Sequence, residues 1–420
     1  MARLPVPGAH VYLVSDPAAI QEAFTHTQRE YAKGVGRRGR EPLKRVLGDG
    51  LLTSPPDLHR EQRRLVRPLF HRERVAGYAA TFTELAEAAA GGWRDGEVRD
   101  AHRDMTALTL AIVARTVFDA DVGDAAVTTI SRALARNQRA LRREILPGGT
   151  LLDRLPLPAT RRWRADSAAV DAVVYGLIEA RRAGTGSARS GPRSAATRSD
   201  RADHPSRPAS EASAESTAPG GNDLLSLLLE TGMPDRRIRD EALTLLLAGH
   251  ETTANSLAWT FALLSHDPAA QERVAGGDRE FTTAVVRESL RLYPPAWAIW
   301  RRLVEAREVG GRPLPAGSTL ILSPWVTHRD PAWWPEAERF APERWLDGPP
   351  PQRYTYFPFG SGPRQCVGNE FAELEAARVT EAVCARWVLA PAPGGRPVVP
   401  QPLITLRPRY GVPLLLRVRR

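Results

Sequence analysis

The sequence predicts a mainly α-helical protein with small β-sheets, and two observations lead to this fold class. Long stretches without internal proline are rich in the helix formers Ala, Leu and Arg, whereas apolar and β-branched runs typical of strands are few and short. We expect helices over residues 81–90, 105–118, 130–145 and 160–182. The expected strands are residues 10–14, 320–322, 404–406 and 412–416.

The longest expected helix spans residues 236–265. Asp235 is a candidate N-cap, because its carboxylate can accept hydrogen bonds from the first free N–H groups. Asp267 and Pro268 mark the end of this helix and the start of the next. About 30 residues at about 1.5 Å each give a rod of roughly 45 Å, which is long enough to cross a whole domain.

The composition favours a large globular protein without a membrane segment. The chain has 420 residues, of which 42% are hydrophobic, so it can bury a large core. Pro5, Pro7 and Gly8 interrupt the N-terminal apolar residues, so no secretory signal forms. No stretch reaches the roughly 18 apolar residues of a membrane span, and two cysteines cannot make a disulfide framework. We therefore expect a cytoplasmic protein.

The positive net charge does not by itself indicate a nucleic-acid-binding protein. The formal charge is +10 and the isoelectric point is about 10.2, values that invite this interpretation. However, lysine occurs only at positions 33 and 44, and arginine is scattered over the whole chain. We attribute the charge to compositional bias and expect no nucleic-acid partner. A basic face for an acidic protein partner remains compatible with this composition.

Residues 183–222 differ from the rest of the chain. This segment contains no Val, Ile, Leu, Met, Phe, Tyr or Trp. A segment without large apolar side chains cannot offset the conformational entropy that ordering costs. We expect a disordered insertion between two helices of a single domain that spans residues 1–420. The alternative is a linker between two domains.

The most informative motif surrounds Cys366 with glycines. Residues 359–368 read Phe-Gly-Ser-Gly-Pro-Arg-Gln-Cys-Val-Gly, and a helical pattern begins at Asn369. Glycines permit close backbone approaches, so amide N–H groups can turn toward the sulfur. The positive end of the following helix also stabilises a thiolate, which is an axial ligand of haem iron. A lone cysteine is more often an inert buried residue, and we interpret Cys384 in this way.

A second motif lies in the middle of the long helix, where residues 248–253 read Ala-Gly-His-Glu-Thr-Thr. Ala248 and Gly249 leave room for a flat cofactor beside the backbone, while Glu251 and Thr252 place a carboxylate next to a hydroxyl. Oxygen activation needs both groups, a hydroxyl as hydrogen-bonding partner and an acid as proton relay. The alternative is a solvated Glu beside a Thr bonded to its own backbone. A His-Glu-x-x-His zinc site is excluded, because alanine occupies the position of the second histidine.

These two motifs resemble the cytochrome P450 family, whose haem loop reads Phe-Gly-x-Gly-x-Arg-x-Cys-x-Gly and whose central helix carries Ala-Gly-x-Asp/Glu-Thr-Thr. The resemblance runs from about Val6 to the C-terminus, with the motifs in the order of the family. It implies the cytochrome P450 fold, with haem b between the long central helix and the helix after the cysteine loop. It also implies that Cys366 binds the iron and that Phe359 and Gly368 lie against the haem.

The resemblance implies a haem-thiolate monooxygenase that inserts one oxygen atom of O2 into a C–H or C=C bond, with Glu251 and Thr252 guiding protons. No Gly-x-Gly-x-x-Gly motif opens a helix after a strand. We therefore expect electrons from a separate ferredoxin or flavodoxin-type donor and its reductase, and we expect a monomer. Two alternatives remain: a peroxide-driven peroxygenase, which usually lacks the acid-alcohol pair, and a catalytically silent haem-binding or recruitment protein.

Four residues match family positions that bind the haem propionates. His59 and Arg63 lie in a stretch that resembles the Trp/His-x-x-x-Arg pair of the family. Arg301 follows a proline pair by six residues, and Arg364 lies in the cysteine loop. Cationic partners suit propionates that are not fully solvated. For each arginine alone, a solvated surface role is the alternative, and Arg302 directly adjoins Arg301.

A third motif, at residues 288–291, places Glu288 and Arg291 on one face of a helix. An isolated pair of this kind would contribute only about 0.2–0.5 kcal/mol. In the resembled family the pair joins an arginine from a later Pro-Glu-Arg-Phe/Trp segment in a buried network, and residues 342–345 match that segment here. The resemblance therefore implies that Glu288, Arg291 and Arg344 support the cysteine loop. Planar guanidinium groups suit such a buried carboxylate.

The resemblance also places a substrate pocket near the cofactor. The expected lining residues are Leu245, Ala296, Trp297, Ala298 and Ile299. Their side chains suggest an apolar, medium-sized substrate such as a terpenoid, a fatty acid or a polyketide.

The start of the chain departs from the resembled family. The proline-rich leader and first helix of the family have no counterpart, because the chain begins almost inside the first strand. We expect either a start further upstream or the loss of part of the substrate entrance.

Overall fold

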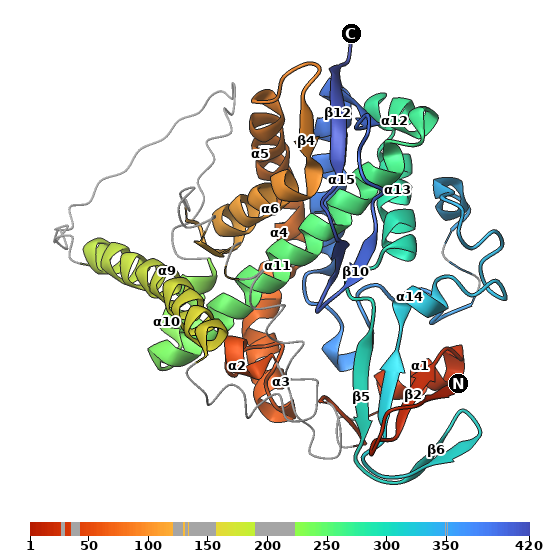
Figure 1. Ribbon diagram of the computed structural model, residues 1–420. Coiled ribbons are helices and arrows are strands. Elements are labelled where there is room, and N and C mark those ends of the chain that lie inside the picture. Colours follow the sequence, from red (N-terminus) through yellow and green to blue (C-terminus); the bar gives the residue numbers. More distant parts are fainter. Residues whose placement is uncertain are drawn as a thin grey trace, which may run out of the picture.

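A computed structural model describes residues 1–26, 30–34, 43–120, 129–130, 133, 157–189, 223–348, 350 and 352–420. A large helical body lies beside a smaller β-rich part that contains the N-terminus (Figure 1). The predicted fold class, mainly helical with small sheets, is confirmed. The helix expected over residues 130–145 lies almost entirely outside the described residues.

The described α-helices are α1 (Pro17–Thr25), α2 (Lys44–Leu47), α3 (Pro56–Val66), α4 (Arg72–Gly77), α5 (Ala79–Gly91), α6 (Ala101–Val117), α9 (Pro158–Arg189), α10 (Leu224–Glu230), α11 (Asp235–Leu264), α12 (Pro268–Ala275), α13 (Arg279–Leu292), α14 (Pro324–Thr327) and α15 (Asn369–Arg386). Short 3-10 helices are η1 (Arg67–Phe70), η2 (Pro342–Trp345) and η3 (Gly362–Arg364). In the described part of the chain, no helix is both long enough and apolar enough to cross a membrane.

The strands form two larger sheets and two hairpins. One sheet has the order β1-β2-β8-β5-β3, in which β2 and β8 are parallel and the other pairs are antiparallel. The second sheet has the order β4-β12-β9, and the hairpins are β6-β7 and β10-β11. Their bounds are β1 (Ala2–Leu4), β2 (Val11–Val14), β3 (Tyr31–Ala32), β4 (Val98–Asp100), β5 (Ile299–Leu303), β6 (Arg307–Val309), β7 (Arg312–Leu314), β8 (Thr319–Leu322), β9 (Trp387–Pro391), β10 (Pro400–Pro402), β11 (Leu406–Pro408) and β12 (Pro413–Val418).

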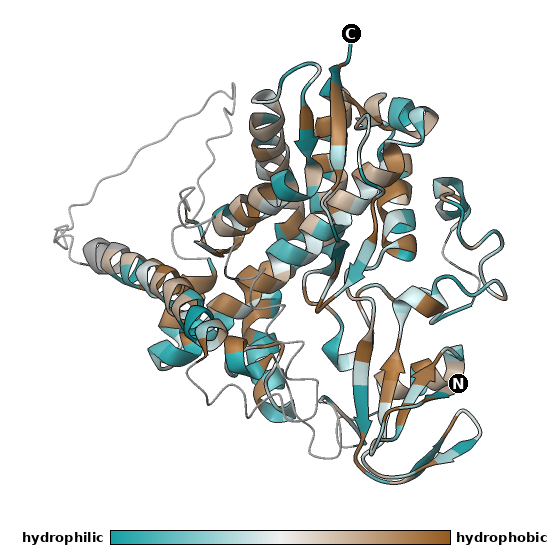
Figure 2. Cartoon of the chain, in the orientation of Figure 1, coloured by the Kyte–Doolittle hydropathy of each residue, from teal (hydrophilic) through white to brown (hydrophobic). Residues whose placement is uncertain are grey.

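Helix α11 forms the centre of the helical body. It crosses the molecule diagonally (Figure 1) and packs against α6, α13 and α15. Its C-terminal half is buried on nearly every side and contributes Leu257, Trp259 and Phe261 to the interior. Hydrophobic segments also mark the strands of both larger sheets (Figure 2). A helix enclosed in this way holds its side chains in fixed places, which suits an element that carries reactive groups.

The helix termini agree with one predicted cap and correct another. Asp267 caps α12, as predicted, because its Oδ1 accepts a hydrogen bond from the N–H of Ala270 at 2.9 Å. In contrast, Asp235 does not cap α11. The N-cap is Pro234, and Asp235 instead pairs with Arg182 of α9, with 2.7 Å between Oδ1 and Nη2.

Two predicted boundaries are wrong. Helix α9 continues to Arg189, so residues 183–189 of the expected insertion are helical, although they include Gly184 and Gly186. The rest of that segment lies outside the described residues. The expected strand at residues 404–406 is displaced: β11 begins only at Leu406, because the N–H of Leu403 bonds to the carbonyl of Thr405 in a turn. The other expected strands appear as β2, β8 and β12.

Candidate active site

The loop before α15 turns sharply around Cys366. Gly360 and Gly362 adopt positive φ angles of 66° and 71°, which side chains other than glycine rarely adopt. A Cβ at position 362 would lie 2.1 Å from the carbonyl oxygen of Phe24, so no side chain fits there. The N–H of Cys366 donates to the carbonyl of Phe359 at 3.0 Å and closes the loop. The predicted role of glycine in this loop therefore has a steric basis.

The environment of the Cys366 thiol combines opposing effects. The residue is accessible to solvent, and desolvation by the surrounding protein raises the pKa of the thiol. The N–H of Gly368 and the guanidinium of Arg63 act in the opposite direction and lower the pKa. A thiol with a raised pKa gives up its proton when it binds a metal cation. Cys384 differs, because it is fully buried on α15 and its pKa rises to about 12.

One face of α11 remains open at the second motif. Ala248 is exposed and Thr252 half-buried, and the Thr252 hydroxyl donates to the carbonyl of Ala248 at 2.6 Å. Since its hydrogen is engaged, the Thr252 oxygen can accept a hydrogen bond from the open side. A Cβ on Gly249 would lie 3.0 Å from Val113, so the glycine also permits close packing of α6.

Glu251 points away from this open face into the protein. Its Oε1 accepts a hydrogen bond from the hydroxyl of Thr405 at 2.5 Å. Burial raises the pKa of Glu251, while the hydrogen bond from Thr405 and the positive charge of Arg407 lower it. Glu251 is half-buried and lies one residue before Thr252 on α11.

The predicted propionate-binding residues surround the cysteine loop. Arg63 Nη1 donates to the carbonyl of Gln365 at 2.6 Å, and Arg364 Nη2 donates to the carbonyl of Ser54 at 2.8 Å. His59 is buried at 3% exposure, and burial together with Arg364 and Arg63 lowers its pKa to about 3. The imidazole of His59 is therefore neutral, and its Nδ1 lacks a hydrogen-bond partner among the described residues.

Arg301 is buried without a compensating carboxylate. It is 7% exposed, and within the described residues it forms no ion pair. Its Nη1 donates to the carbonyl of Trp300 at 3.0 Å and its guanidinium lies over the ring of Phe24. Burial, followed by the neighbouring Arg364, lowers its pKa to about 10. Buried cations require anionic partners, and the two propionates of haem would supply such charges. The residues present therefore fit the haem that the sequence resemblance implies.

We expect Arg301→Leu to release haem about tenfold or more faster than the parent protein, because charge-assisted hydrogen bonds stabilise a propionate more than neutral ones do. Arg301→Lys should restore part of the retention. The rate of haem transfer to excess apomyoglobin measures the effect. Arg302→Leu serves as the control, since adjacent residues of strand β5 point to opposite faces. Equal haem loss from both leucine variants would contradict this role for Arg301.

The third motif lies apart from the open face and forms a buried ionic group. Glu288 and Arg291 are both fully buried, and Arg291 donates to Glu288 through Nε and Nη2 at 2.8 Å each. Arg344 of η2 donates to the same carboxylate at 3.1 Å. The three residues named from the sequence therefore lie together, although residue 344 is 56 positions from residue 288.

The predicted pocket residues differ in exposure. Leu245 is only 7% exposed and belongs to the main core, whereas residues 296–299 are half-buried. Ile299 approaches the cysteine loop, because its Cδ1 lies 3.4 Å from the position of a Cβ on Gly360. Trp297 is anchored by a hydrogen bond from Nε1 to the carbonyl of Leu403 at 2.9 Å.

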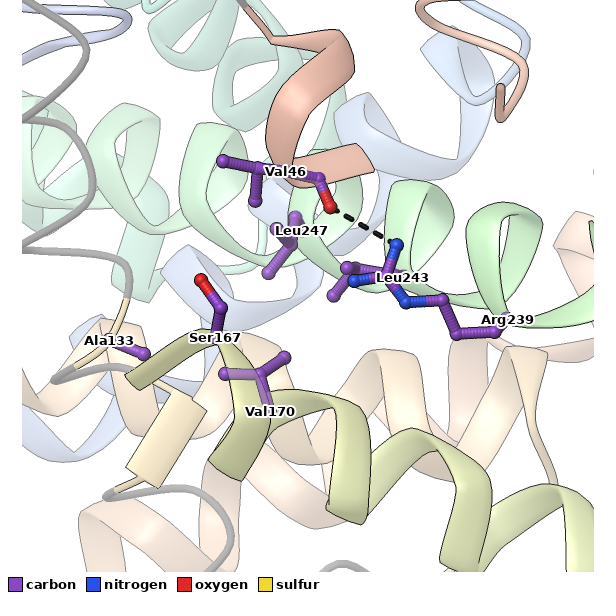
Figure 3. A pocket seen from close by; sticks show the side chains of 7 residues that line it. All are labelled: Val46, Ala133, Ser167, Val170, Arg239, Leu243 and Leu247. Atoms are coloured by element: carbon purple, nitrogen blue, oxygen red, sulfur yellow. Dashed lines mark hydrogen bonds between the residues drawn. The ribbon is translucent and has the colours of Figure 1, made fainter. Parts of the chain in front are cut away.

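A separate small pocket lies where α2, α9 and α11 meet (Figure 3). Val46, Val170 and Leu243 give it an apolar lining, and Arg239 closes one side by donating to the carbonyl of Val46 at 3.2 Å. Its volume of about 10 Å³ suits at most one water molecule. It is therefore no substrate site, and none of the predicted pocket residues lines it.

Sequence reasoning missed several polar residues near the two motifs. Glu375 on α15 is fully buried, and burial raises its pKa well above the usual range, with Thr253 as the neighbour that lowers it. A carboxylate within the buried, mostly apolar face of α15 is a signal that could have identified it. Asn255 and Thr405, in contrast, carry no local signal, because their partners lie far away in the sequence.

Comparisons with known proteins agree with the geometry. A family model described as Cytochrome P450 matches residues 1–412. Cyclooctatin synthase of Streptomyces melanosporofaciens is 34% identical over 94% of this chain and 84% of its own. Pentalenene oxygenase of Streptomyces avermitilis is 29% identical over 95% of this chain and 86% of its own. The solved structure of CYP175A1 from Thermus thermophilus covers 99% of this chain and 91% of its own, at 33% identity and a TM-score of 0.76.

Proposed function

Because this chain belongs to the cytochrome P450 family, we propose that it inserts one oxygen atom of O2 into a C–H or C=C bond of an apolar cyclic terpenoid. The chain is an oxidoreductase of the monooxygenase class with haem b as its cofactor. The observation that carries the proposal is the cysteine loop, which turns an N–H toward Cys366 at the N-terminus of α15. The acid-alcohol pair of α11 favours this reaction over a peroxide-driven one.

Specific residues would hold the cofactor. Cys366 would supply the axial thiolate, and Arg63, Arg301 and Arg364, with the neutral imidazole of His59, would bind the propionates. Bound haem supplies electron transfer and oxygen activation, which no side chain can perform. The exposed Ala248 leaves space along α11 on the open face.

Thr252 and Glu251 of α11 would bind and transfer protons. Thr252 presents an acceptor oxygen to the open face, because its own hydrogen is bonded to the carbonyl of Ala248. Glu251 would store or release a proton, because burial raises the pKa of its carboxyl group and so favours the protonated form. Because Glu251 bonds to Thr405 and adjacent helical side chains do not face each other, water would have to carry a proton from Glu251 to the Thr252 hydroxyl.

We expect Thr252→Ala to bind haem and substrate normally but to lower the product formed per electron pair by about tenfold or more, since a positioned proton relay contributes about 10²-fold or more. Reducing equivalents should appear as hydrogen peroxide instead. Simultaneous assays of product, peroxide and electron-donor consumption measure this coupling. Thr252→Ser keeps the hydroxyl and should retain most of it. Full coupling in the alanine variant would show that another group performs the relay.

The names of two relatives support the proposed substrate class. One is described as cyclooctat-9-en-7-ol 5-monooxygenase and another as pentalenene oxygenase. Both names denote cyclic carbon skeletons with few or no polar groups. Residues 296–299 of this chain, which include two alanines, a tryptophan and an isoleucine, offer a matching apolar surface. We therefore place the substrate among cyclic terpenoid hydrocarbons and their alcohols.

Electrons would come from a separate protein carrier. Arg64, Arg67 and Arg72 are exposed on α3, η1 and α4, and α3 adjoins the cysteine loop through the bond from Arg63 to Gln365. A cluster of exposed arginines attracts an acidic partner. A ferredoxin or flavodoxin-type donor with its reductase would meet this requirement.

The proposal is tested with purified protein, a surrogate ferredoxin and ferredoxin reductase. A panel of cyclic terpenes is first screened for displacement of water from the iron by its effect on the haem absorption spectrum. Ligands that bind are then incubated with ¹⁸O2, and the products are analysed by mass spectrometry. Incorporation of one ¹⁸O atom supports the monooxygenase. Turnover that requires only hydrogen peroxide, or no turnover of any binding ligand, contradicts it.

A further inference from the structure

Three side chains from separate parts of the chain connect Glu251 to the surface-facing start of α6. His102 lies in the first turn of α6, and its Nε2 is 2.9 Å from Oδ1 of Asn255 on α11. Asn255 Nδ2 donates to Thr405 Oγ1 at 3.2 Å, and Thr405 donates to Glu251 Oε1 at 2.5 Å. Asn255 is fully buried and Thr405 is 7% exposed, so the hydrogen bond between these two residues is protected from water.

When Glu251 is ionised, the chemistry of the four side chains determines the direction of every hydrogen bond between them. Thr405 has a single hydroxyl hydrogen, which it gives to Glu251, so its oxygen accepts from the amide of Asn255. This places the amide NH2 of Asn255 toward Thr405 and its oxygen toward His102. His102 must therefore donate through Nε2, which requires a hydrogen on that nitrogen. All donors point toward the carboxylate, as they should if Glu251 is ionised.

We propose that Thr405, Asn255 and His102 are positioning residues that hold the Glu251 carboxylate ionised and turned toward β11, and thereby set the pH at which Glu251 takes up a proton. This inference rests on the proposed monooxygenase function, in which Glu251 supplies protons at the open face of α11. Release of the bond to Thr405 accompanies protonation, because a neutral carboxyl accepts a hydrogen bond less strongly than a carboxylate does.

The charged groups around these hydrogen-bonded side chains affect the protonation of Glu251 and His102. Arg407 of β11 stabilises the ionised form of Glu251 and opposes a positive charge on His102. Asp100, the N-cap of α6, favours a positive charge on His102, whereas burial disfavours it. His250, next to Glu251 in sequence, is fully buried and neutral, because burial and then His102 lower its pKa to about 4. Arg407 is therefore the charge that acts directly on Glu251 alongside the hydrogen bond.

The test follows the protonation of Glu251 itself rather than turnover. Infrared spectra of the haem-containing protein are recorded against pH, and the carboxylic C=O band that disappears in Glu251→Gln is assigned to Glu251. Thr405→Val has the same shape without the hydroxyl, and should raise the midpoint of this band by about one to two pH units, because a hydrogen bond to a charged group is lost. Thr405→Ser should restore the midpoint of the parent protein.

A matched control separates positioning from a general packing effect. Thr260→Val makes the same change at a fully buried threonine of α11, whose hydroxyl bonds, among the described residues, to the carbonyl of Ser256. Its infrared midpoint should stay unchanged. An unshifted midpoint in Thr405→Val, or an equal shift in Thr260→Val, would overturn the proposal.

The contribution of His102, the last side chain in this series of hydrogen bonds, is tested with two variants. His102→Leu removes the donor to Asn255 and should move the midpoint in the same direction as Thr405→Val, by a smaller amount. His102→Gln offers a neutral donor and should return it toward the parent value. An unshifted midpoint in His102→Leu would remove His102 from the proposal. Carbon-monoxide spectra of the same samples distinguish this outcome from failure of the proposed function. Absence of the thiolate band in the parent protein would refute the proposed function. The infrared midpoint would still test the roles of Thr405, Asn255 and His102.

Discussion

Replacing Cys366 with histidine is expected to abolish the red-shifted Soret band of the reduced, carbon-monoxide-bound protein that gives the family its name. The band depends on an axial thiolate, which donates more electron density to the iron than an imidazole does. Desolvation raises the pKa of the Cys366 thiol, whereas the N–H of Gly368 and the charge of Arg63 oppose this effect and would stabilise a thiolate bound to iron. A spectrum of the dithionite-reduced protein with and without carbon monoxide measures the loss.

The second cysteine provides the control for this experiment. Cys384 is fully buried and is the other free thiol of the chain. Cys384→Ala should keep the band, although removal of a buried side chain from the core destabilises the fold. Retention of the thiolate band in Cys366→His would mean that another group binds the iron. Loss of the band in both variants would indicate a general failure of the fold.

The parts of the site that sequence analysis could predict are encoded locally. The ten residues around Cys366 contain both the glycines that the turn requires and the cysteine that it presents, so their spacing alone carries the chemistry. The same holds for Glu251 and Thr252, which are adjacent on α11. Asp267 was predictable as a cap because a helix start depends only on a few neighbouring residues.

The remaining features depend on contacts between distant segments. Thr405 reaches Glu251 across 154 positions, and Asn255 reaches His102 across 153. No local pattern marks a threonine in a short turn as the partner of a buried carboxylate. Gly249 illustrates a related limit. The sequence shows that a small residue is present, but only the packing of Val113 from α6 shows which neighbour requires it.

The predicted ends of helices and strands are wrong where the local sequence signal is weak. Three residues at 404–406 are too few to fix where a strand begins, and the backbone hydrogen bond from Leu403 to Thr405 forms a turn that delays the strand until Leu406. The sequence predicts that α9 ends at residue 182, directly before the segment without large apolar side chains. Apolar content reports packing against a core rather than helicity, so the helix runs on to Arg189.

We expect Glu288→Gln to lower the free energy of unfolding by about 3–5 kcal/mol, because it removes the negative charge from a buried group of two guanidiniums. The carboxylate accepts five hydrogen bonds, from Arg291 Nε and Nη2, Arg344 Nε, Trp345 Nε1 and the N–H of Ala341, at 2.8–3.1 Å. A glutamine side chain offers only one oxygen, and its NH2 group would face donors. Arg291, which is fully buried, would then keep its charge without compensation. Urea unfolding followed by circular dichroism measures the change.

An exposed pair of the same type shows why burial determines the size of this effect. Glu336 and Arg339 are also three residues apart and 2.9 Å from each other, but their side chains are 68% and 65% exposed. Water screens this pair and competes for its hydrogen bonds, so Glu336→Gln should change the free energy of unfolding by at most about 0.5 kcal/mol. Similar losses in the two variants would contradict the role of Glu288 as the centre of a buried network. A large loss of stability in Glu288→Gln alone, together with loss of haem, would show that this network supports the loop that presents Cys366. That loop follows η2 in the sequence.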